Sequence, residues 1–193
     1  MRLSPIEHPQ GIKMRLAYAW SRKALGKAIT PLKVVYARCP KSLDLGRAMS
    51  KFLRTPFRIE KELVFLIESY TAGLNKCGFC LDIAQAMALR ARPGVMDKIA
   101  ALPEFRTSPK FSPRERAALT YVEATTRDKH VSDDIFAALQ EHFTAEEIVE
   151  ITLVNAAENF YNMVNIPLEI ESDGLCALVP KAGRATVSAG ARH

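Results

Sequence analysis

Cysteine is scarce in this chain: four cysteines in 193 residues are too few for a small scaffold held together by disulfides. Long apolar runs are missing as well. The densest run, LVFLI at 63–67, is far shorter than the roughly 18 residues that a membrane-spanning helix needs. The N-terminal MRLSPIEHPQ has no apolar stretch of the kind that a secretory signal carries. We therefore expect a cytoplasmic protein without a membrane span.

The composition is that of an ordinary globular protein. Hydrophobic residues make up 48% of the chain and charged residues 25%, which argues against a disordered or collagen-like chain. A length of 193 residues is enough for one sizeable core and short for two ordinary domains.

Positive charge is concentrated in the first third of the chain. Residues 1–61 contain 14 Lys/Arg and 3 Asp/Glu, a net charge of +11, whereas the remaining residues have a net charge of −5. The cations Lys13, Arg15, Arg22 and Lys23 fall nearly all round a helix rather than on one face. We expect a solvated or subunit-facing basic surface in preference to nucleic-acid binding, and a peripheral contact with an anionic membrane is the remaining alternative.

Helical patterns run through the chain, and no segment has a convincing strand pattern. Apolar residues at close to helical spacing, among them Ile12, Leu16 and Trp20, predict a helix over 11–28. Turn and capping signals delimit further helices over 31–39, 42–53, 60–74 and 76–90. The predicted fold class is all-α.

Capping signals also mark the helix starts of the second half. Ser112 with Glu115, and Thr144 with Glu147, form two capping boxes. A third helix is predicted to start between them, at Ser132. The helix after Thr144 is long and is expected to end before a proline at position 167.

The most informative stretch is NKCGFCLDIAQAM, residues 75–87, in which Asn75 is predicted to be the N-cap of a helix. Cys77 and Cys80 are one helical turn apart, so both sulfurs lie on one face, close enough to form a disulfide. The amides of a helix N-terminus and the charge of Lys76 stabilise a thiolate there. An accessible thiolate with a neighbouring thiol is what a redox-active pair needs.

Three other interpretations of the pair compete with this one. Two cysteines can be small core hydrophobes. They can also be half of a zinc site, but Cys39 and Cys176 are isolated and the four histidines have no paired spacing, so we expect no metal. A thioredoxin-type motif requires a preceding strand, and none is predicted.

The chain resembles the carboxymuconolactone decarboxylase family, and within it the alkyl hydroperoxidase D-like, peroxidase-related branch. The resemblance lies in three stretches: EKELVFLIESYTAGLNKCGFCLDIAQAM, FSPRERAALTYVEATT and VSDDIFAALQEHFTAEEIVEITLVNAAENFYNMVN. It covers about residues 57–168 and implies an all-helical homo-oligomer, whether dimer, trimer or hexamer. It also implies an antioxidant dithiol that reduces a small hydroperoxide without a cofactor and is re-reduced by a thiol or lipoyl-protein carrier.

The family pattern implies roles for individual residues. Cys80 attacks the peroxide and Cys77 resolves the oxidised sulfur. The family's glutamate, 12 residues before the first cysteine, falls on Phe65 in this sequence. Glu62 fits the pattern if SYTAGLNK contains a three-residue insertion, and it is our catalytic candidate; Glu68, nearer the cysteines, is the other.

The sequence departs from the pattern at the histidine that follows the pair, which is Ala84 here. That position lies one turn after Cys80 on the same face, where an imidazole takes the thiol proton. Asp82 points about 200° away from Cys80 along the helix and is expected to be exposed. The proton relay is therefore incomplete, and the dithiol is expected to react slowly.

A polar stripe on the last long helix is the second candidate feature: Asn155, Glu158, Asn159, Asn162 and Asn165. Such a stripe is either the solvent face or a lined pocket or subunit seam. Four amides suit fixed hydrogen bonding better than a solvated face does. Glu158, Asn159 and Asn162 are the candidate substrate-pocket residues, and Glu158 could supply the proton acceptor that Ala84 cannot.

These observations predict three parts and one function. A basic N-terminal helical extension (1–56) packs on a carboxymuconolactone decarboxylase-like helical domain (57–171), and a C-terminal tail (172–193) follows, mobile over 181–193. The expected function is that of a peroxidase-like thiol oxidoreductase. The alternatives are a non-redox decarboxylase or isomerase of a small lactone or carboxylate, and a non-catalytic redox sensor or oligomeric scaffold.

Overall fold

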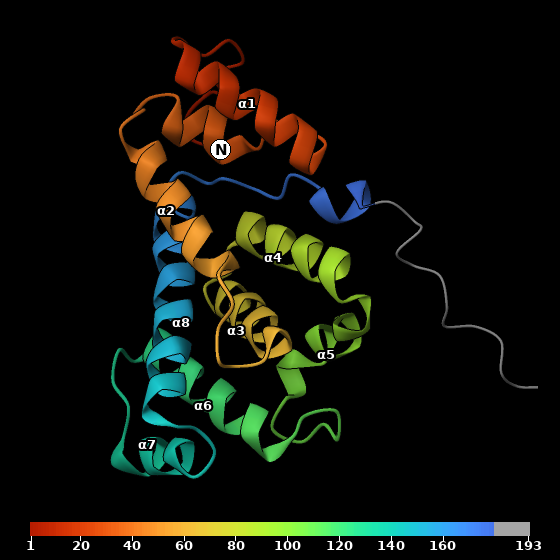
Figure 1. The fold of residues 1–193 in the computed structure, drawn as a ribbon, viewed down its shortest axis with the longest axis vertical. Coiled ribbons are helices and arrows are strands. Elements are labelled where there is room, and N and C mark those ends of the chain that lie inside the picture. The colour runs from red at the N-terminus through yellow and green to blue at the C-terminus, as the bar shows by residue number, and fades with distance from the viewer. Residues whose placement is uncertain (180–193) are drawn as a thin grey trace, which may run out of the picture.

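The computed structural model describes residues 1–179, so the predicted mobile tail at 181–193 lies outside the described residues. Over 1–179 the chain forms helices and no strand, which confirms the all-α prediction (Figure 1). The longer helices are α1 (Ile12–Leu25), α2 (Ser42–Arg54), α3 (Lys61–Leu74), α4 (Gly78–Ala91), α5 (Met96–Ala100), α6 (Pro113–Arg127), α7 (Asp133–Gln140) and α8 (Ala145–Asn165). The short ones are η1 (Leu32–Tyr36), η2 (Pro93–Val95), η3 (Leu102–Glu104) and η4 (Leu175–Leu178). No helix within 1–179 is both long and apolar enough to cross a bilayer.

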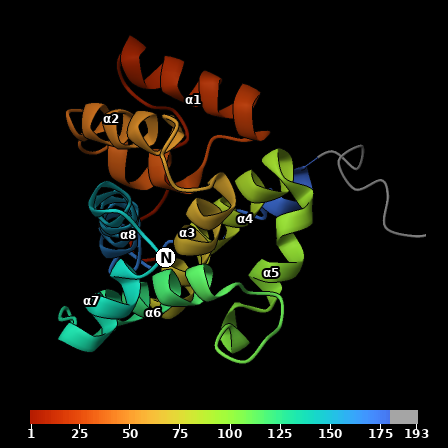
Figure 2. The ribbon, with the colours of Figure 1, turned by 60° about the horizontal axis from the view of Figure 1, so that its bottom comes forward.

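The central helix is α3, which packs against α4, α6 and α8 (Figures 1 and 2). Its first half contains the run at 63–67, and all of these side chains are buried. Its second half buries the hydroxyls of Ser69 and Thr71 instead. The interior therefore changes from apolar to polar toward the end of α3 from which the chain enters the cysteine motif.

Both capping boxes are present. The backbone N–H of Glu115 donates to Ser112 Oγ at 3.2 Å, and the Glu115 carboxylate accepts from the Ser112 N–H at 2.8 Å. Thr144 and Glu147 make the same reciprocal pair at the start of α8. Because each box satisfies two amides that a helix N-terminus otherwise leaves unpaired, these local signals set where α6 and α8 begin.

The N-terminal helix α1 turns a different face inward from the one its apolar spacing suggests. Met14, Tyr18, Ser21 and Leu25 are buried, and the Tyr18 hydroxyl donates to the Ile6 carbonyl at 2.7 Å. Ile12, Leu16 and Trp20 face outward; they are 72%, 62% and 56% exposed. The helix therefore has two apolar faces, and only one of them packs on the protein.

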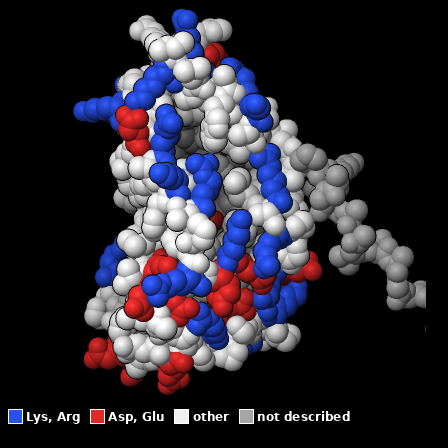
Figure 3. Space-filling view, in the orientation of Figure 1, with Lys and Arg blue, Asp and Glu red and all other residues white. Residues whose placement is uncertain are grey.

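Together α1, η1 and α2 form a layer at one end of the molecule (Figure 1). On the face shown in Figure 3, lysine and arginine predominate over this end, whereas acidic residues gather at the opposite end. The basic residues that are concentrated in the first third of the sequence thus also lie together at one end of the folded molecule.

The segment after α8 runs back between the N-terminal layer and α4 (Figure 1). Asp173 ties it to the layer, because its carboxylate accepts from the Thr30 N–H at 2.7 Å and the Thr30 hydroxyl at 2.8 Å. Lys27 pairs with the same carboxylate at 2.9 Å. The two ends of the described chain therefore meet over the start of α4.

Candidate active site

Cys77 and Cys80 lie at the N-terminus of α4 and are joined in a disulfide. Cys77, rather than the predicted Asn75, is the N-cap: its sulfur accepts from the Cys80 N–H at 3.4 Å. The reason is the tight connection from α3, in which Lys76 adopts a left-handed conformation (φ 57°) and the Cys77 N–H bonds back to the Ala72 carbonyl. The turn moves the helix start two residues along the chain.

Both sulfurs are covered, since each cysteine is only 2% exposed. The cover is apolar and comes from both ends of the chain: Leu25 and Val34 from the N-terminal layer, and Ile170, Leu175 and Val179 from the C-terminal segment. The pair is therefore shielded from small molecules in this structure.

One polar side chain touches the pair from α8. The Asn165 side-chain amide donates from Nδ2 to the Cys80 sulfur at 3.3 Å. Ala84, at the histidine position of the family pattern, is buried and 5% exposed, so no imidazole stands on that side of the sulfur. The residue that contacts Cys80 was thus visible in the sequence as part of the polar stripe, but its contact with the cysteine was not.

The polar stripe on α8 faces the interior, which excludes the solvent-face interpretation. Asn155, Glu158, Asn162 and Asn165 are each at most 5% exposed, and Asn159 is partly buried. They pack toward the polar half of α3 and the beginning of α4, so amides rather than long charged side chains are used here.

Four members of the stripe, Asn155, Glu158, Asn159 and Asn162, belong to a connected hydrogen-bond network. Asn75 donates from Nδ2 to Asn159 Oδ1 at 2.9 Å and to Asn162 Oδ1 at 2.8 Å. Asn162 in turn donates to the Glu158 carboxyl at 2.7 Å. Earlier on α8, Asn155 Oδ1 accepts from the hydroxyl of Thr71 at 2.8 Å. Because Asn75 directly precedes Lys76 and Cys77, the network links the cysteine motif to a buried acid.

Two buried acidic groups have raised pKa values here: Glu158, which belongs to the network, and Glu68 of α3. Burial, with the nearby charge of Glu68, raises the pKa of Glu158 to about 8 against the opposing hydrogen bond from Asn162. Burial also raises the pKa of Glu68 to about 7. Burial therefore favours the protonated form of Glu158 at neutral pH.

The structure does not bring Glu62 to the cysteines. Glu62 lies in the first turn of α3, ten residues before Ala72, which is about 15 Å along the helix axis. Its carboxylate pairs with Lys98 at 2.6 Å, at the edge of a hollow of about 300 Å³ that Arg92 and Glu115 also line. Glu68, the other candidate, lies one turn before Ala72 and so nearer the pair.

Asp82 is buried rather than exposed as predicted; it is 8% exposed. Its carboxylate accepts from the Leu175 N–H at 2.8 Å, the Cys176 N–H at 3.1 Å and the Ser172 hydroxyl at 2.9 Å. Burial alone would raise the pKa of Asp82, but these hydrogen bonds outweigh it and lower the pKa. The residue anchors the C-terminal segment to α4, and no local pattern in the sequence indicates so distant a partner.

Metal binding has no obvious place in the described part of the chain. Within residues 1–179, no three His, Cys, Asp or Glu side chains are grouped so that they could hold a metal ion. The chemistry that the site can support is that of two adjacent sulfurs, a contacting amide and a buried acid.

Comparison with known proteins adds to this geometry. None of the protein-family models matches the chain. The chain is 34% identical over 168 residues to YnjA of Escherichia coli K12, an uncharacterized protein, and the match covers 84% of this chain and 90% of YnjA.

Solved structures share the fold. The debrominase Bmp8 superimposes with a TM-score of 0.74 at 21% identity, covering 92% of this chain and 95% of Bmp8. A peroxidase-related protein of Ralstonia eutropha JMP134 with an alkylhydroperoxidase AhpD core gives a TM-score of 0.72 at 20% identity, covering 91% and 96%. The chain therefore belongs to the same family as YnjA and has the alkyl hydroperoxidase D-like fold of the carboxymuconolactone decarboxylase family, as its sequence resemblance implies.

Proposed function

We propose that the chain is a thiol oxidoreductase that reduces small hydroperoxides with the Cys77–Cys80 pair. The observation that carries the proposal is the disulfide across the first turn of α4. A non-redox decarboxylase or isomerase has no use for two sulfurs so placed. The fold shared with peroxidase-related proteins supports the same class of reaction.

The proposed reaction has two steps. The Cys80 thiolate attacks the terminal oxygen of the hydroperoxide; an S–O bond forms, the O–O bond breaks, and the alkoxide takes a proton and leaves as the alcohol. The Cys77 thiol then attacks the Cys80 sulfenic acid, forming the disulfide and releasing water. A dithiol carrier, such as a lipoylated protein, reduces the disulfide and is itself oxidised.

We assign the proton for the departing alkoxide to Glu158. It is protonated at neutral pH because burial and the Glu68 charge raise its pKa to about 8. Glu158 and Asn165 share one face of α8, about 10 Å apart along the axis. In this proposal the proton crosses that distance through water that enters when the segments covering the site open. Asn165 lies at the end of this path next to Cys80, because its side-chain amide donates to the Cys80 sulfur.

The test is peroxide treatment of the fully reduced chain, with intact mass and peptide mapping as readouts. We expect loss of two hydrogens at 77–80 in the wild type, a Cys80 sulfenic acid that a dimedone probe traps in Cys77→Ser, and no probe adduct in Cys80→Ser. Cys39→Ser, a variant outside the pair, should behave like the wild type. Thiols of the pair that stay inert to peroxide would overturn the proposal.

A second candidate, a redox sensor, is favoured by Ala84 and by the covered sulfurs. Turnover separates the two functions: an enzyme consumes many equivalents of hydroperoxide when a dithiol reductant is present, whereas a sensor is oxidised and reduced once without sustained consumption. A Bmp8 variant has been solved in complex with 2,3,4-tribromopyrrole. This compound is therefore included as an alternative two-electron acceptor in the same assay.

We further propose a homo-oligomer whose interface includes the outer face of α8. This helix exposes apolar side chains along its length: Val149, Leu153, Phe160, Met163 and Ile166. Such a contiguous apolar face is typical of a protein interface. Met163→Glu should lower the molar mass measured by light scattering, while Glu104→Gln, an exposed change elsewhere, should not.

A further inference from the structure

The outward face of α1 carries an apolar ridge formed by Ile12, Leu16 and Trp20. These residues follow one another at four-residue steps and are the large side chains that α1 leaves exposed. The opposite face of the same helix holds it to the protein through Met14 and Tyr18. The ridge is therefore rigidly presented, since its helix cannot rotate without unpacking the layer.

Cations flank this ridge. At 100° per residue, Arg15 and Arg22 lie on one side of it and Lys23 lies at its C-terminal end, all exposed. The helix itself contains no acidic residue. Within residues 1–179, neither Arg15 nor Arg22 forms an ion pair, whereas Lys13, on the other side, pairs with Asp44 at 2.6 Å. Two guanidinium groups are thus available to an external anion.

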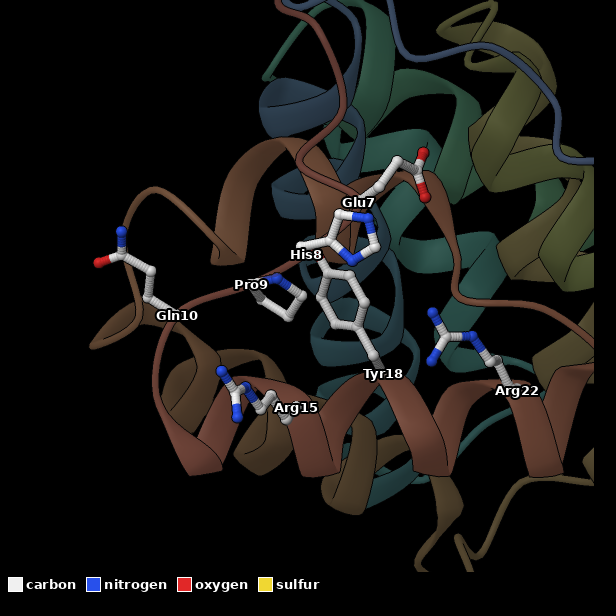
Figure 4. A pocket seen from close by; sticks show the side chains of 7 residues that line it. All are labelled: Glu7, His8, Pro9, Gln10, Arg15, Tyr18 and Arg22. Atoms are coloured by element: carbon white, nitrogen blue, oxygen red, sulfur yellow. The ribbon is translucent and has the colours of Figure 1, made fainter.

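The two arginines line a hollow of about 350 Å³ between α1 and the chain that precedes it (Figure 4). In this view their side chains lie on either side of Tyr18, and His8 faces them from the preceding loop. Glu7 also lines the hollow, but its charge is engaged by Lys33 at 2.9 Å. The hollow therefore presents unpaired guanidinium donors of the kind that bind phosphate oxygens.

We propose that α1 docks on the surface of a bilayer containing anionic phospholipid. The ridge of Ile12, Leu16 and Trp20 enters the boundary between headgroups and acyl chains, and Arg15 and Arg22 bind lipid phosphates in the hollow beside it. A helix of 14 residues with an apolar face and flanking cations has the form of an interfacial helix. This proposal concerns a surface outside the cysteine site and does not depend on the proposed reaction.

Other occupants fit the surface less well. A nucleic acid offers phosphates but no apolar phase for an exposed Ile12 and Leu16. An antiparallel two-fold contact between copies through α1 would bring Arg15 and Arg22 against the same cations of the partner subunit. A bilayer offers the apolar boundary and the anions together, and tryptophan is enriched at that boundary.

The experiment uses the full chain and its single tryptophan, Trp20, as the reporter. Vesicles of phosphatidylcholine alone are compared with equimolar phosphatidylcholine and phosphatidylglycerol, by co-sedimentation and by Trp20 emission. With the anionic vesicles we expect the protein to co-sediment, and the emission to shift to shorter wavelength. Binding should weaken at high salt, because the phosphate contacts are screened. Inorganic phosphate alone should not shift the emission.

Matched variants assign the binding to α1. Arg15→Gln/Arg22→Gln should weaken binding about 30-fold, since each cation at an anionic surface contributes about 1 kcal/mol. Ile12→Ser/Leu16→Ser should abolish the Trp20 shift while leaving the fold intact, because both side chains are exposed. Lys110→Gln/Arg127→Gln removes the same charge from exposed positions on the other side of the bundle, and Phe136→Ser removes an exposed apolar group from α7; both should bind like the wild type.

Three outcomes would overturn the proposal. The first is no co-sedimentation with the anionic vesicles. The second is binding that the α1 variants leave unchanged or that the control variants weaken equally. The third is a Trp20 shift that grows with protein concentration in the absence of lipid, because the ridge then belongs to a contact between copies of this chain.

Discussion

The Asn165 side-chain amide lies 3.3 Å from the Cys80 sulfur and donates to it from the last turn of α8. With Ala84 at the histidine position, this amide is the polar side chain that meets the attacking sulfur of the proposed reaction. A hydrogen bond to the charged form of a group lowers its pKa. Asn165 should therefore favour the thiolate of reduced Cys80.

The first prediction is that Asn165→Leu raises the pKa of the Cys80 thiol by about one pH unit, the size of one lost hydrogen bond. Asn165→Asp should raise it further, because a carboxylate repels the thiolate. The measurement is the pH dependence of Cys80 alkylation in a Cys77→Ser background, followed by peptide mass spectrometry. An unchanged alkylation profile in both variants would show that Asn165 does not act on the reduced sulfur.

The second prediction is that Ala84→His speeds the oxidation of Cys80 by hydroperoxide at neutral pH. Position 84 is one turn after Cys80, so an imidazole there can accept the thiol proton, an effect typically of about 10²–10⁴ in rate. We expect about tenfold, because Ala84 is buried and overpacking such a site costs about 1–3 kcal/mol. Ala84→Leu, which adds volume without a base, is the matched control and should show no gain in stopped-flow kinetics.

The third prediction concerns pH and stability. Folded Glu158 keeps its proton up to about pH 8, whereas an unfolded glutamate loses it near its ordinary pKa of 4.5. Between these values the unfolded state binds fewer protons, so the free energy of unfolding falls as pH rises. Glu158→Gln should make this fall shallower and stabilise the protein most at pH 8, by a few kcal/mol at most.

Urea midpoints at pH 5, 6, 7 and 8 check that expectation. Glu68, whose pKa is raised to about 7, also makes the free energy of unfolding fall as pH rises. The Glu158→Gln variant should therefore keep part of this pH dependence. Glu104→Gln, at an exposed carboxylate, is the control and should follow the wild type. If the comparison with Glu158→Gln shows that Glu158 makes the free energy of unfolding rise from pH 5 to pH 8, Glu158 is not a buried acid with a raised pKa.

The fourth prediction is that Asp82→Ala loosens the segment 172–179. Two backbone amides, those of Leu175 and Cys176, lose their acceptor, at a cost of about 1–3 kcal/mol for each group left unpaired. Because this segment helps to cover the disulfide, a phosphine should reduce Cys77–Cys80 faster. Hydrogen exchange of the two amides should rise in parallel, and Asp128→Ala, an exposed carboxylate at the end of α6, should change neither.

The sequence predicted the parts of the fold that depend on neighbours along the chain. The starts of α6 and α8 follow from Ser112 and Thr144, whose partners lie three residues away. The pairing of Cys77 with Cys80 is equally local, because helix geometry alone brings residues one turn apart together. Helical periodicity likewise predicted the all-α class, and the family resemblance agreed with it.

Residues that depend on distant segments could not be assigned in the same way. Asp82 is buried because a segment 90 residues later folds over it, and Asn165 reaches Cys80 from 85 residues away. The orientation of α1 was hidden because both of its faces carry apolar residues, so periodicity did not distinguish the packed face from the outer one. Glu62 was a candidate because the family pattern, with an assumed three-residue insertion, places a glutamate there, yet the length of α3 separates it from the cysteines.

The disulfide links residues only three apart in sequence. A cross-link stabilises a protein mainly by reducing the conformational entropy of the unfolded chain, and a small loop reduces this entropy less than a long one. Reduction of this disulfide should therefore lower the melting temperature less than reduction of one that closes a long loop would. In the proposed reaction, the stability of the fold is then only weakly coupled to the redox state of Cys77 and Cys80.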